Sequence, residues 1–116
     1  MKNTLEYFEE IMQIPRESGK EEKIANYLIN YAKENNIEYS LGKYNTVFFK
    51  KNNNSDKTII LQAHSDMVCV SLDNYDFDNK GIPFYIDGDY YKSKNTSLGA
   101  DDGIGLAIIL AILQEN

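Results

Sequence analysis

The feature that most constrains the fold is a short apolar run in the middle of the chain, Thr58-Ile59-Ile60-Leu61. It has the length of a strand, and its apolar side chains follow one another without the polar alternation of a half-exposed strand. Such runs are typical of strands buried on both faces, which occur where helices cover a parallel sheet. We therefore expect this run to lie inside a covered sheet.

Helical patterns precede this run. Asn3 with Glu6 forms a capping-box pattern, and Ser18 with Glu21 forms a second one ahead of a longer stretch that ends near Asn35-Asn36. The apolar residues at helical spacing are Leu5, Phe8, Ile11 and Met12 in the first stretch, and Ile24, Tyr27, Leu28, Tyr31 and Ala32 in the second. This spacing predicts two helices that each bury one face.

The rest of the chain alternates between strand and turn patterns. Candidate strands are residues 37–41, 46–49, 82–86 and 90–92, and residues 104–113 form an apolar helical stretch. Residues 52–56 have the composition of a turn, and Asp87-Gly88 favours a type I′ hairpin turn. Together these patterns predict an α/β fold with a partial mixed, largely parallel sheet flanked by helices.

Charge and composition narrow the class of function. The formal charge is −6 and Lys50-Lys51 is the only adjacent basic pair, so no basic patch is available for nucleic acid. The apolar stretches are too short to cross a bilayer, and the N-terminus lacks the apolar run of a secretory signal. Cys69 is the single cysteine, which fits a reducing cytoplasm. We expect a cytoplasmic protein with no nucleic-acid partner and no membrane partner.

The single histidine, His64, follows the apolar run at the expected carboxyl end of its strand, where open α/β sheets bind ligands. Asp66 lies two residues further on, and an extended backbone points both side chains to the same side. A carboxylate that accepts a hydrogen bond from one ring nitrogen leaves the other nitrogen free for a metal. The alternative interpretation is that Asp66 only begins a turn.

Two adjacent carboxylates, Asp101 and Asp102, stand between Gly99-Ala100 and Gly103 at the expected start of the last helix. Aspartates at this position can simply cap the helix and interact with its dipole. Alternatively, the small neighbours let the backbone approach a bound ion or substrate, and one carboxylate is a ligand. The pair alone does not decide between these interpretations.

Three motifs occur in order: Ile14-Pro15-Arg16-Glu17-Ser18-Gly19, then Leu61-Gln62-Ala63-His64-Ser65-Asp66-Met67, then Ser97-Leu98-Gly99-Ala100-Asp101-Asp102-Gly103. Together they resemble the aminoacyl-histidine dipeptidases, the cytosolic Xaa-His (carnosine-type) enzymes of the wider aminoacylase and carboxypeptidase metallopeptidase family. The resemblance runs nearly the whole length of this chain, which corresponds to about the first quarter of such an enzyme.

The resemblance implies a role for each matching residue. His64 matches a ligand of one of two divalent metals, usually zinc, although manganese or cobalt would suit the same donors. Asp101 matches the carboxylate that bridges both metals, and the peptide bond that follows it, to Asp102, is cis in the family. Asp102 is often asparagine there, which implies that it is not a ligand. Asp66 matches an aspartate with a catalytic role that orients a metal-binding histidine.

The resemblance also implies that much of the enzyme is missing from this sequence. A glutamate base with an adjacent glutamate ligand, a further aspartate, a distant histidine and a lid-like dimerisation domain have no counterpart here. Residues 1–116 are therefore expected to be the N-terminal portion of the catalytic domain. The intact enzyme would hydrolyse Xaa-His dipeptides and could form a homodimer, whereas this chain alone would be inactive.

Two alternatives stay open. A tripeptidase of the wider family resembles the chain less, because Met67 and Gly103 stand where those enzymes tend to have threonine and lysine. The other alternative is a catalytically silent, truncated domain that binds metal weakly or binds a protein partner. One local departure from the dipeptidases is Val70, which stands where they usually have glutamate.

Overall fold

The computed structural model describes residues 1–52 and 54–115. Its helices are α1 (Thr4–Met12), α2 (Glu22–Glu34), a short 3-10 turn η1 (Lys43–Asn45) and α3 (Ala100–Leu113). Its strands are β1 (Glu38–Leu41), β2 (Val47–Lys50), β3 (Phe84–Asp87) and β4 (Tyr90–Ser93). Within this described part, no helix is long and apolar enough to cross a membrane.

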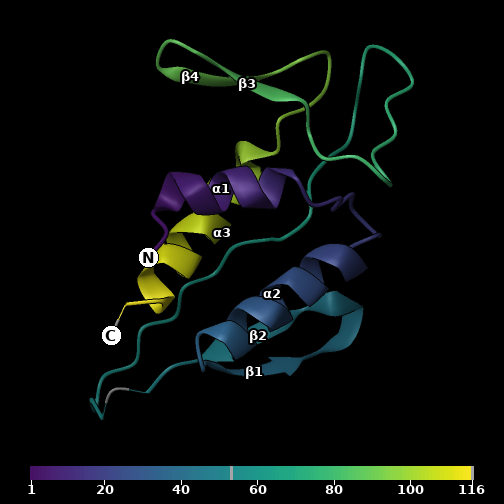
Figure 1. Ribbon diagram of the computed structural model, residues 1–116. Helices are drawn as coiled ribbons and strands as arrows, with labels where there is room; N and C mark the ends of the chain where they lie inside the picture. Colours follow the sequence, from purple (N-terminus) through teal and green to yellow (C-terminus); the bar gives the residue numbers. More distant parts are fainter. Residues whose placement is uncertain (53, 116) are drawn as a thin grey trace.

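The capping box expected at the first helix is confirmed. The Asn3 side chain accepts from the Glu6 amide at 2.9 Å, and the Glu6 carboxylate accepts from the Asn3 amide at 3.2 Å. The buried face consists of Tyr7, Phe8, Ile11 and Met12, and it packs against α3 (Figure 1). Leu5, which the spacing placed on the buried face, is half exposed, whereas Tyr7 is buried.

The second expected capping box is wrong. Glu21 occupies the N-cap of α2 without a side-chain cap, and its carboxylate accepts from the Gly19 amide at 2.7 Å instead. The Ser18 hydroxyl donates to Asp66, a partner distant in the sequence. The helix nevertheless ends as expected, with Glu34 its last residue and Asn36 in a left-handed conformation at φ 56°.

The strands form two separate antiparallel hairpins, β1–β2 and β3–β4. The α/β class is therefore confirmed, but the described residues contain no largely parallel sheet. Their one parallel pairing is an isolated bridge between Glu17 and Met67. The β3–β4 turn consists of Gly88 and Asp89, with positive φ at Gly88 alone, as in a type II′ turn. The expected type I′ turn at Asp87-Gly88 is shifted by one residue.

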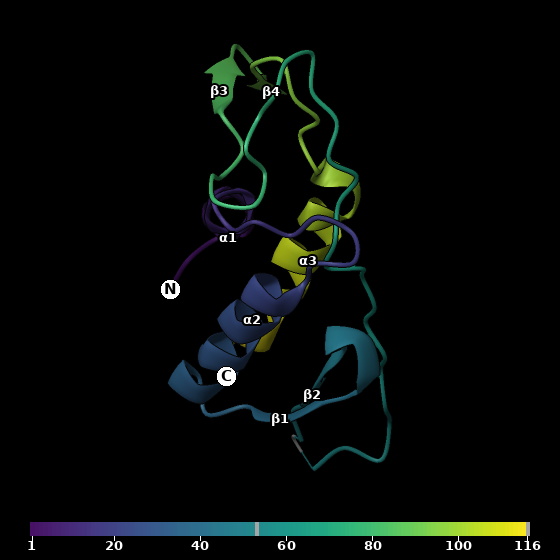
Figure 2. The same ribbon diagram turned by 90° about the vertical axis from the view of Figure 1, so that its right-hand side faces the viewer.

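The apolar run Thr58-Ile59-Ile60-Leu61 is not a buried strand. Ile59 and Ile60 are 84% and 85% exposed, and the run belongs to no strand. Figure 2 shows the segment that follows β2 running along the right-hand edge of the molecule. The prediction is wrong because a buried strand needs partner strands and covering helices, which the described residues do not place beside this run. The predicted turn at residues 52–56 includes Asn53, which lies outside the described residues.

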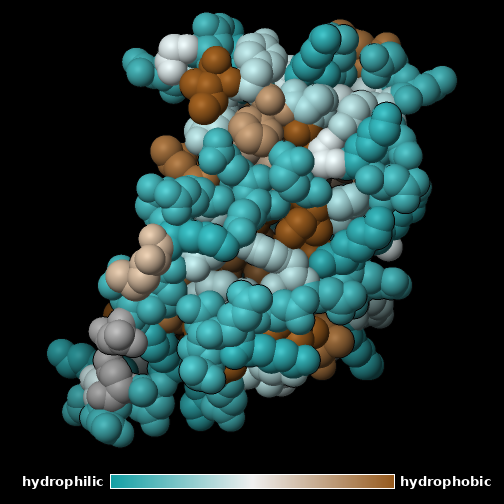
Figure 3. Space-filling model, in the orientation of Figure 1, coloured by the Kyte–Doolittle hydropathy of each residue, from teal (hydrophilic) through white to brown (hydrophobic). Residues whose placement is uncertain are grey.

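The core lies between the three helices. Ile24 and Leu28 of α2 and Leu106 and Leu110 of α3 are buried in one cluster with the apolar face of α1. The Tyr31 hydroxyl donates to the Leu110 carbonyl at 2.6 Å and ties α2 to α3. The expected helix at residues 104–113 is confirmed, although α3 begins earlier. The space-filling view in Figure 3 shows hydrophobic patches among hydrophilic side chains on the face it presents.

Candidate metal centre

The structure brings the three predicted site residues, His64, Asp66 and Asp101, into direct contact. His64 Nδ1 lies 3.0 Å from Asp66 Oδ1 and 3.1 Å from the Asp66 carbonyl oxygen. On the other side of the ring, His64 Nε2 lies 3.2 Å from Asp101 Oδ1. The histidine is therefore held between a carboxylate of its own segment and one from the start of α3.

The partners of the imidazole fix its tautomer. Both atoms that face Nδ1 are oxygens that can only accept, so Nδ1 carries the proton and donates. In the neutral ring Nε2 then presents a lone pair toward the Asp101 carboxylate, which is also an acceptor. Two acceptors at this distance require a proton or a cation between them. The Asp101 carboxylate, followed by the hydrogen bonds with Asp66, accordingly raises the pKa of His64.

The spacing of these two atoms also suits a metal. Two donors at about 2.05 Å from a tetrahedral zinc ion stand about 3.3 Å apart, close to the 3.2 Å between His64 Nε2 and Asp101 Oδ1. The Asp101 side chain is 98% exposed and the His64 side chain 51%, so solvent reaches both atoms. The described residues offer no group of three or more His, Cys, Asp or Glu arranged to hold a metal. These two atoms therefore fit part of a metal site, for which the remaining ligands would have to come from elsewhere.

Asp66 is itself held in place by Ser18, whose hydroxyl donates to Asp66 Oδ2. This hydrogen bond is the main reason that the pKa of Asp66 is lowered, and the His64 imidazole adds to the effect. The sequence interpretation missed Ser18 because its spacing from Glu21 favoured a helix cap. The signal that could have found it is its place in the first of the three ordered motifs.

The two adjacent aspartates have different roles. Asp102 Oδ1 accepts from the Gly105 amide at 3.1 Å and so caps the first regular turn of α3. Asp101 points away from the helix toward His64. The peptide bond between them is cis, which confirms the expectation drawn from the family resemblance. The helix-cap interpretation thus fits Asp102, and the ligand interpretation remains available for Asp101 alone.

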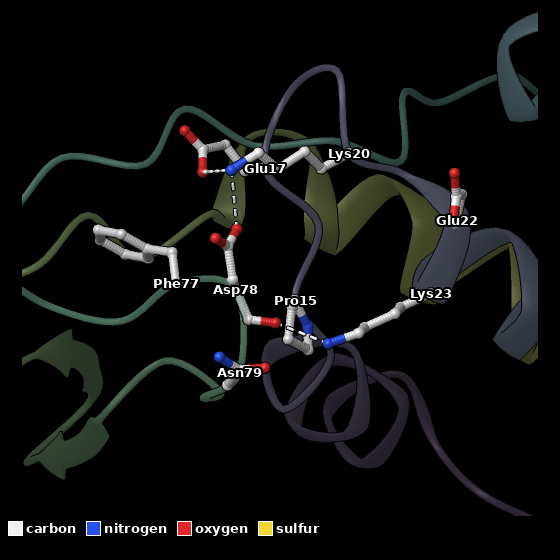
Figure 4. Close-up of a pocket in the computed structure, with 8 residues that line it drawn as sticks. All are labelled: Pro15, Glu17, Lys20, Glu22, Lys23, Phe77, Asp78 and Asn79. Atoms are coloured by element: carbon white, nitrogen blue, oxygen red, sulfur yellow. Dashed lines mark hydrogen bonds and ion pairs between the residues drawn. The ribbon is translucent and has the colours of Figure 1, made fainter.

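A pocket elsewhere on the surface contains none of these residues. Figure 4 shows its lining, in which Lys20 lies between Glu17 and Asp78, with the Lys20–Asp78 ion pair at 2.9 Å. Lys23 donates to the Asp78 carbonyl at 2.6 Å. The Lys20 ammonium is thus paired with carboxylates of the same pocket, and the pocket shares no residue with the candidate metal centre.

Comparison with known proteins finds relatives of one class. No family model matches the chain. The relatives found by sequence and by structure are both dipeptidases, so the resemblance to the aminoacyl-histidine dipeptidases is confirmed. The dipeptidases are the class of protein to which this fold and these motifs are similar.

The particular relatives are a bacterial enzyme and a solved structure. The chain is 36% identical over 114 residues to the cytosol non-specific dipeptidase of Escherichia coli (strain K12), covering 93% of this chain and 24% of that protein. The crystal structure of aminoacylhistidine dipeptidase from Vibrio alginolyticus matches with a TM-score of 0.87 and 36% identity, covering 97% of this chain and 24% of that one. The chain therefore spans about a quarter of the length of these relatives.

Proposed function

We propose that this chain is the N-terminal portion of the catalytic domain of a metal-dependent dipeptidase, in which His64 and Asp101 supply two donors of a two-metal site. The observation that carries the proposal is the approach of the Asp101 carboxylate to His64 Nε2 at 3.2 Å. The dipeptidase relatives give this geometry its chemical context.

Each residue has a distinct task in this proposal. Asp66 accepts from Nδ1 and so keeps the lone pair on Nε2, the arrangement usual for metal-binding histidines. Asp101 projects an exposed carboxylate toward His64, and its two oxygens could bridge two ions. A pair of divalent ions, zinc or else manganese or cobalt, would lower the pKa of a bound water and polarise the scissile carbonyl.

The intact protein would hydrolyse dipeptides. More specifically, we propose that its substrates are Xaa-His dipeptides. We propose a cytosolic location by analogy with the cytosol non-specific dipeptidase of Escherichia coli, and we include a homodimer in the proposal. We also propose that residues 58–63 form a strand of a larger, largely parallel sheet in the intact protein, since Ile59 and Ile60, which would point to opposite faces of a strand, are both exposed here.

The site proposal is tested by zinc titration of the 116-residue chain with isothermal calorimetry. Two protein donors predict weak binding, because catalytic zinc sites normally use three. His64→Ala should abolish that binding, and Asp101→Asn should weaken it. Binding that survives His64→Ala would show that the ligand assignment is wrong.

The matched control is the neighbouring substitution Asp102→Asn. The asparagine carbonyl can still accept from the Gly105 amide, and this side chain does not contact His64. Zinc affinity should stay within about twofold of the original chain. If Asp102→Asn and Asp101→Asn weaken zinc binding equally, the loss of affinity comes from removing one negative charge in this segment, and Asp101 is not a specific donor.

The coding sequence distinguishes the dipeptidase proposal from the alternative of a catalytically silent domain. An open frame that continues past Asn116 into a Glu-Glu pair and a later histidine supports the dipeptidase. A genuine stop codon with no such continuation supports the silent domain.

A further inference from the structure

Arg16 is buried to 1% exposure in the turn between α1 and α2, and its guanidinium contacts both segments of the candidate site. Nη1 donates to the carbonyl oxygens of Ser65 and Asp66, each at 3.2 Å, and Nη2 donates to the Gly99 carbonyl at 2.7 Å. The first two acceptors adjoin His64, and the third precedes the aspartate pair. One side chain therefore links the two segments that carry the donors.

The neighbouring glycines leave room for this guanidinium. A Cβ at Gly99 would lie 2.6 Å from Arg16 Nη2 and 2.7 Å from Met67 Sδ, and a Cβ at Gly103 would lie 2.8 Å from the same nitrogen. Such approaches are closer than van der Waals contact allows. The glycines beside the aspartates thus admit a protein side chain, whereas one of the two sequence interpretations gave that space to an ion or a substrate.

The backbone of Arg16 is attached to the same segment. Its carbonyl accepts from the Met67 amide at 2.9 Å, and the Ser18 amide donates to the Met67 carbonyl at 3.2 Å. The Ser18 hydroxyl then contacts Asp66. Backbone and side chain therefore hold this turn against the residues that carry His64.

Burying the Arg16 cation costs stability, and packing in the fold does not by itself require a charged side chain at this position. No described carboxylate forms an ion pair with Arg16, and its Nε is buried without a hydrogen-bond partner in the described structure. Burial lowers the pKa of Arg16 despite the attraction of the nearby Asp66 charge, so the buried cation is destabilising relative to an apolar side chain of similar volume unless its contacts compensate. Packing alone would therefore favour an apolar residue, so the three carbonyl contacts are the reason to keep an arginine.

We propose that Arg16 is a positioning residue, which sets the separation of His64 and Asp101 by fixing the carbonyls of Ser65, Asp66 and Gly99. This inference rests on the proposed metal site. The planar fork of arginine can donate to several carbonyls in fixed directions, whereas the single ammonium of lysine cannot reproduce that geometry.

The test compares Arg16→Lys and Arg16→Met with a destabilised control, Leu28→Ala, in zinc titrations of the 116-residue chain. Leu28 is a buried residue of α2 that makes no contact with the site residues in the interactions described above. Both Arg16 variants should bind zinc at least about tenfold more weakly, the range seen when partners of metal ligands are lost. Leu28→Ala should bind within about twofold of the original chain once it is folded, as judged by near-ultraviolet circular dichroism.

Two results would overturn the inference. One is a folded Arg16→Lys chain with unchanged zinc affinity. The other is failure of both Arg16 variants to fold while Leu28→Ala folds, which would show that Arg16 acts through the stability of the fold.

A metal-free measurement separates this inference from the proposed function. A nuclear Overhauser effect between the His64 ring and the Asp101 β protons should be present in the original chain and in Leu28→Ala, and absent in Arg16→Lys. If the original chain binds no zinc, the metal site is refuted, and this effect alone then decides the role of Arg16. Its persistence in Arg16→Lys would refute positioning even if zinc binds.

Discussion

At the scale of single residues, Gly103 lies where a larger side chain would meet two buried neighbours. An added Cβ would stand 2.8 Å from Arg16 Nη2 and 3.1 Å from Phe8 Cε1, and both of these side chains are buried. We predict that Gly103→Ala lowers the free energy of unfolding by about 1–2 kcal/mol, because overpacking outweighs the gain in helix propensity. Urea denaturation measures the change.

Gly42 provides the comparison for this prediction. Its added Cβ would approach Phe48 Cε2 at 3.1 Å, but Phe48 is 57% exposed and can turn away. Gly42→Ala should therefore change the free energy of unfolding by less than about 0.5 kcal/mol. Equal effects at Gly42 and Gly103 would contradict the packing explanation.

Tyr31 gives a second prediction at this scale, because its hydroxyl makes a buried hydrogen bond to the Leu110 carbonyl at 2.6 Å. Tyr31→Phe should lower the free energy of unfolding by about 1 kcal/mol. The effect stays moderate because the same carbonyl also accepts from the Gln114 amide at 3.2 Å. Tyr90→Phe, at a residue that is 70% exposed, should leave the urea midpoint unchanged. A midpoint unaltered by Tyr31→Phe would show that this bond does not join α2 to α3.

At the scale of elements, residues 58–63 form a segment that includes the apolar residues Ile59, Ile60 and Leu61 and has no strand pairing in the described structure. Their amides should exchange with solvent as fast as those of an unfolded peptide, whereas the amides of Leu106 and Leu110 in α3 should be protected. Hydrogen exchange followed by NMR makes the comparison at single residues. Slow exchange at Ile59 and Ile60 would show that the segment pairs with another strand in solution.

The elements that the sequence predicted correctly depend on neighbours in the chain. The capping box of Asn3 and Glu6 involves residues three positions apart, and Asn36 ends α2 through its own backbone conformation. The misassigned elements depend on distant partners. The Ser18 hydroxyl donates to Asp66 and does not form the predicted capping box with Glu21. The run at residues 58–61 is exposed because the strands that would bury it are not beside it in the described structure. Local spacing contains no information about such partners.

In the candidate site, too, the contacts between near neighbours in the chain were predictable from spacing, whereas the contacts between distant residues were not. The spacing of His64 and Asp66 within one segment favoured their contact, although it left open that Asp66 only begins a turn. The approach of Asp101 and the cis bond that follows it came from the family resemblance, since neither is visible in local spacing. The contacts of Arg16 needed the three-dimensional structure, because its acceptors are backbone carbonyls that any sequence would supply.

At the scale of the whole molecule, the chain exposes more surface than its mass predicts for a self-contained protein. The accessible surface is 7973 Å², whereas a folded monomer of 13.3 kDa exposes about 6450 Å². The radius of gyration is 14.9 Å, compared with about 13.4 Å for a compact domain of this length. The excess includes large apolar side chains such as Ile59, Ile60 and Ile112. These quantities support the proposal that the chain is one portion of a larger domain.

That property leads to a prediction about activity. The described residues bring two candidate donors together, His64 and Asp101, whereas a catalytic zinc site normally takes three protein ligands and a water. The 116-residue chain with added zinc should therefore hydrolyse an Xaa-His dipeptide no faster than its His64→Ala variant. Release of free histidine, followed by chromatography, measures the rate. The paired variant is necessary because a contaminating host dipeptidase would give the same rate in both preparations. Turnover that depends on His64 in the isolated chain would mean that its own residues complete the site, and the proposal that further ligands lie elsewhere in the intact protein would be wrong.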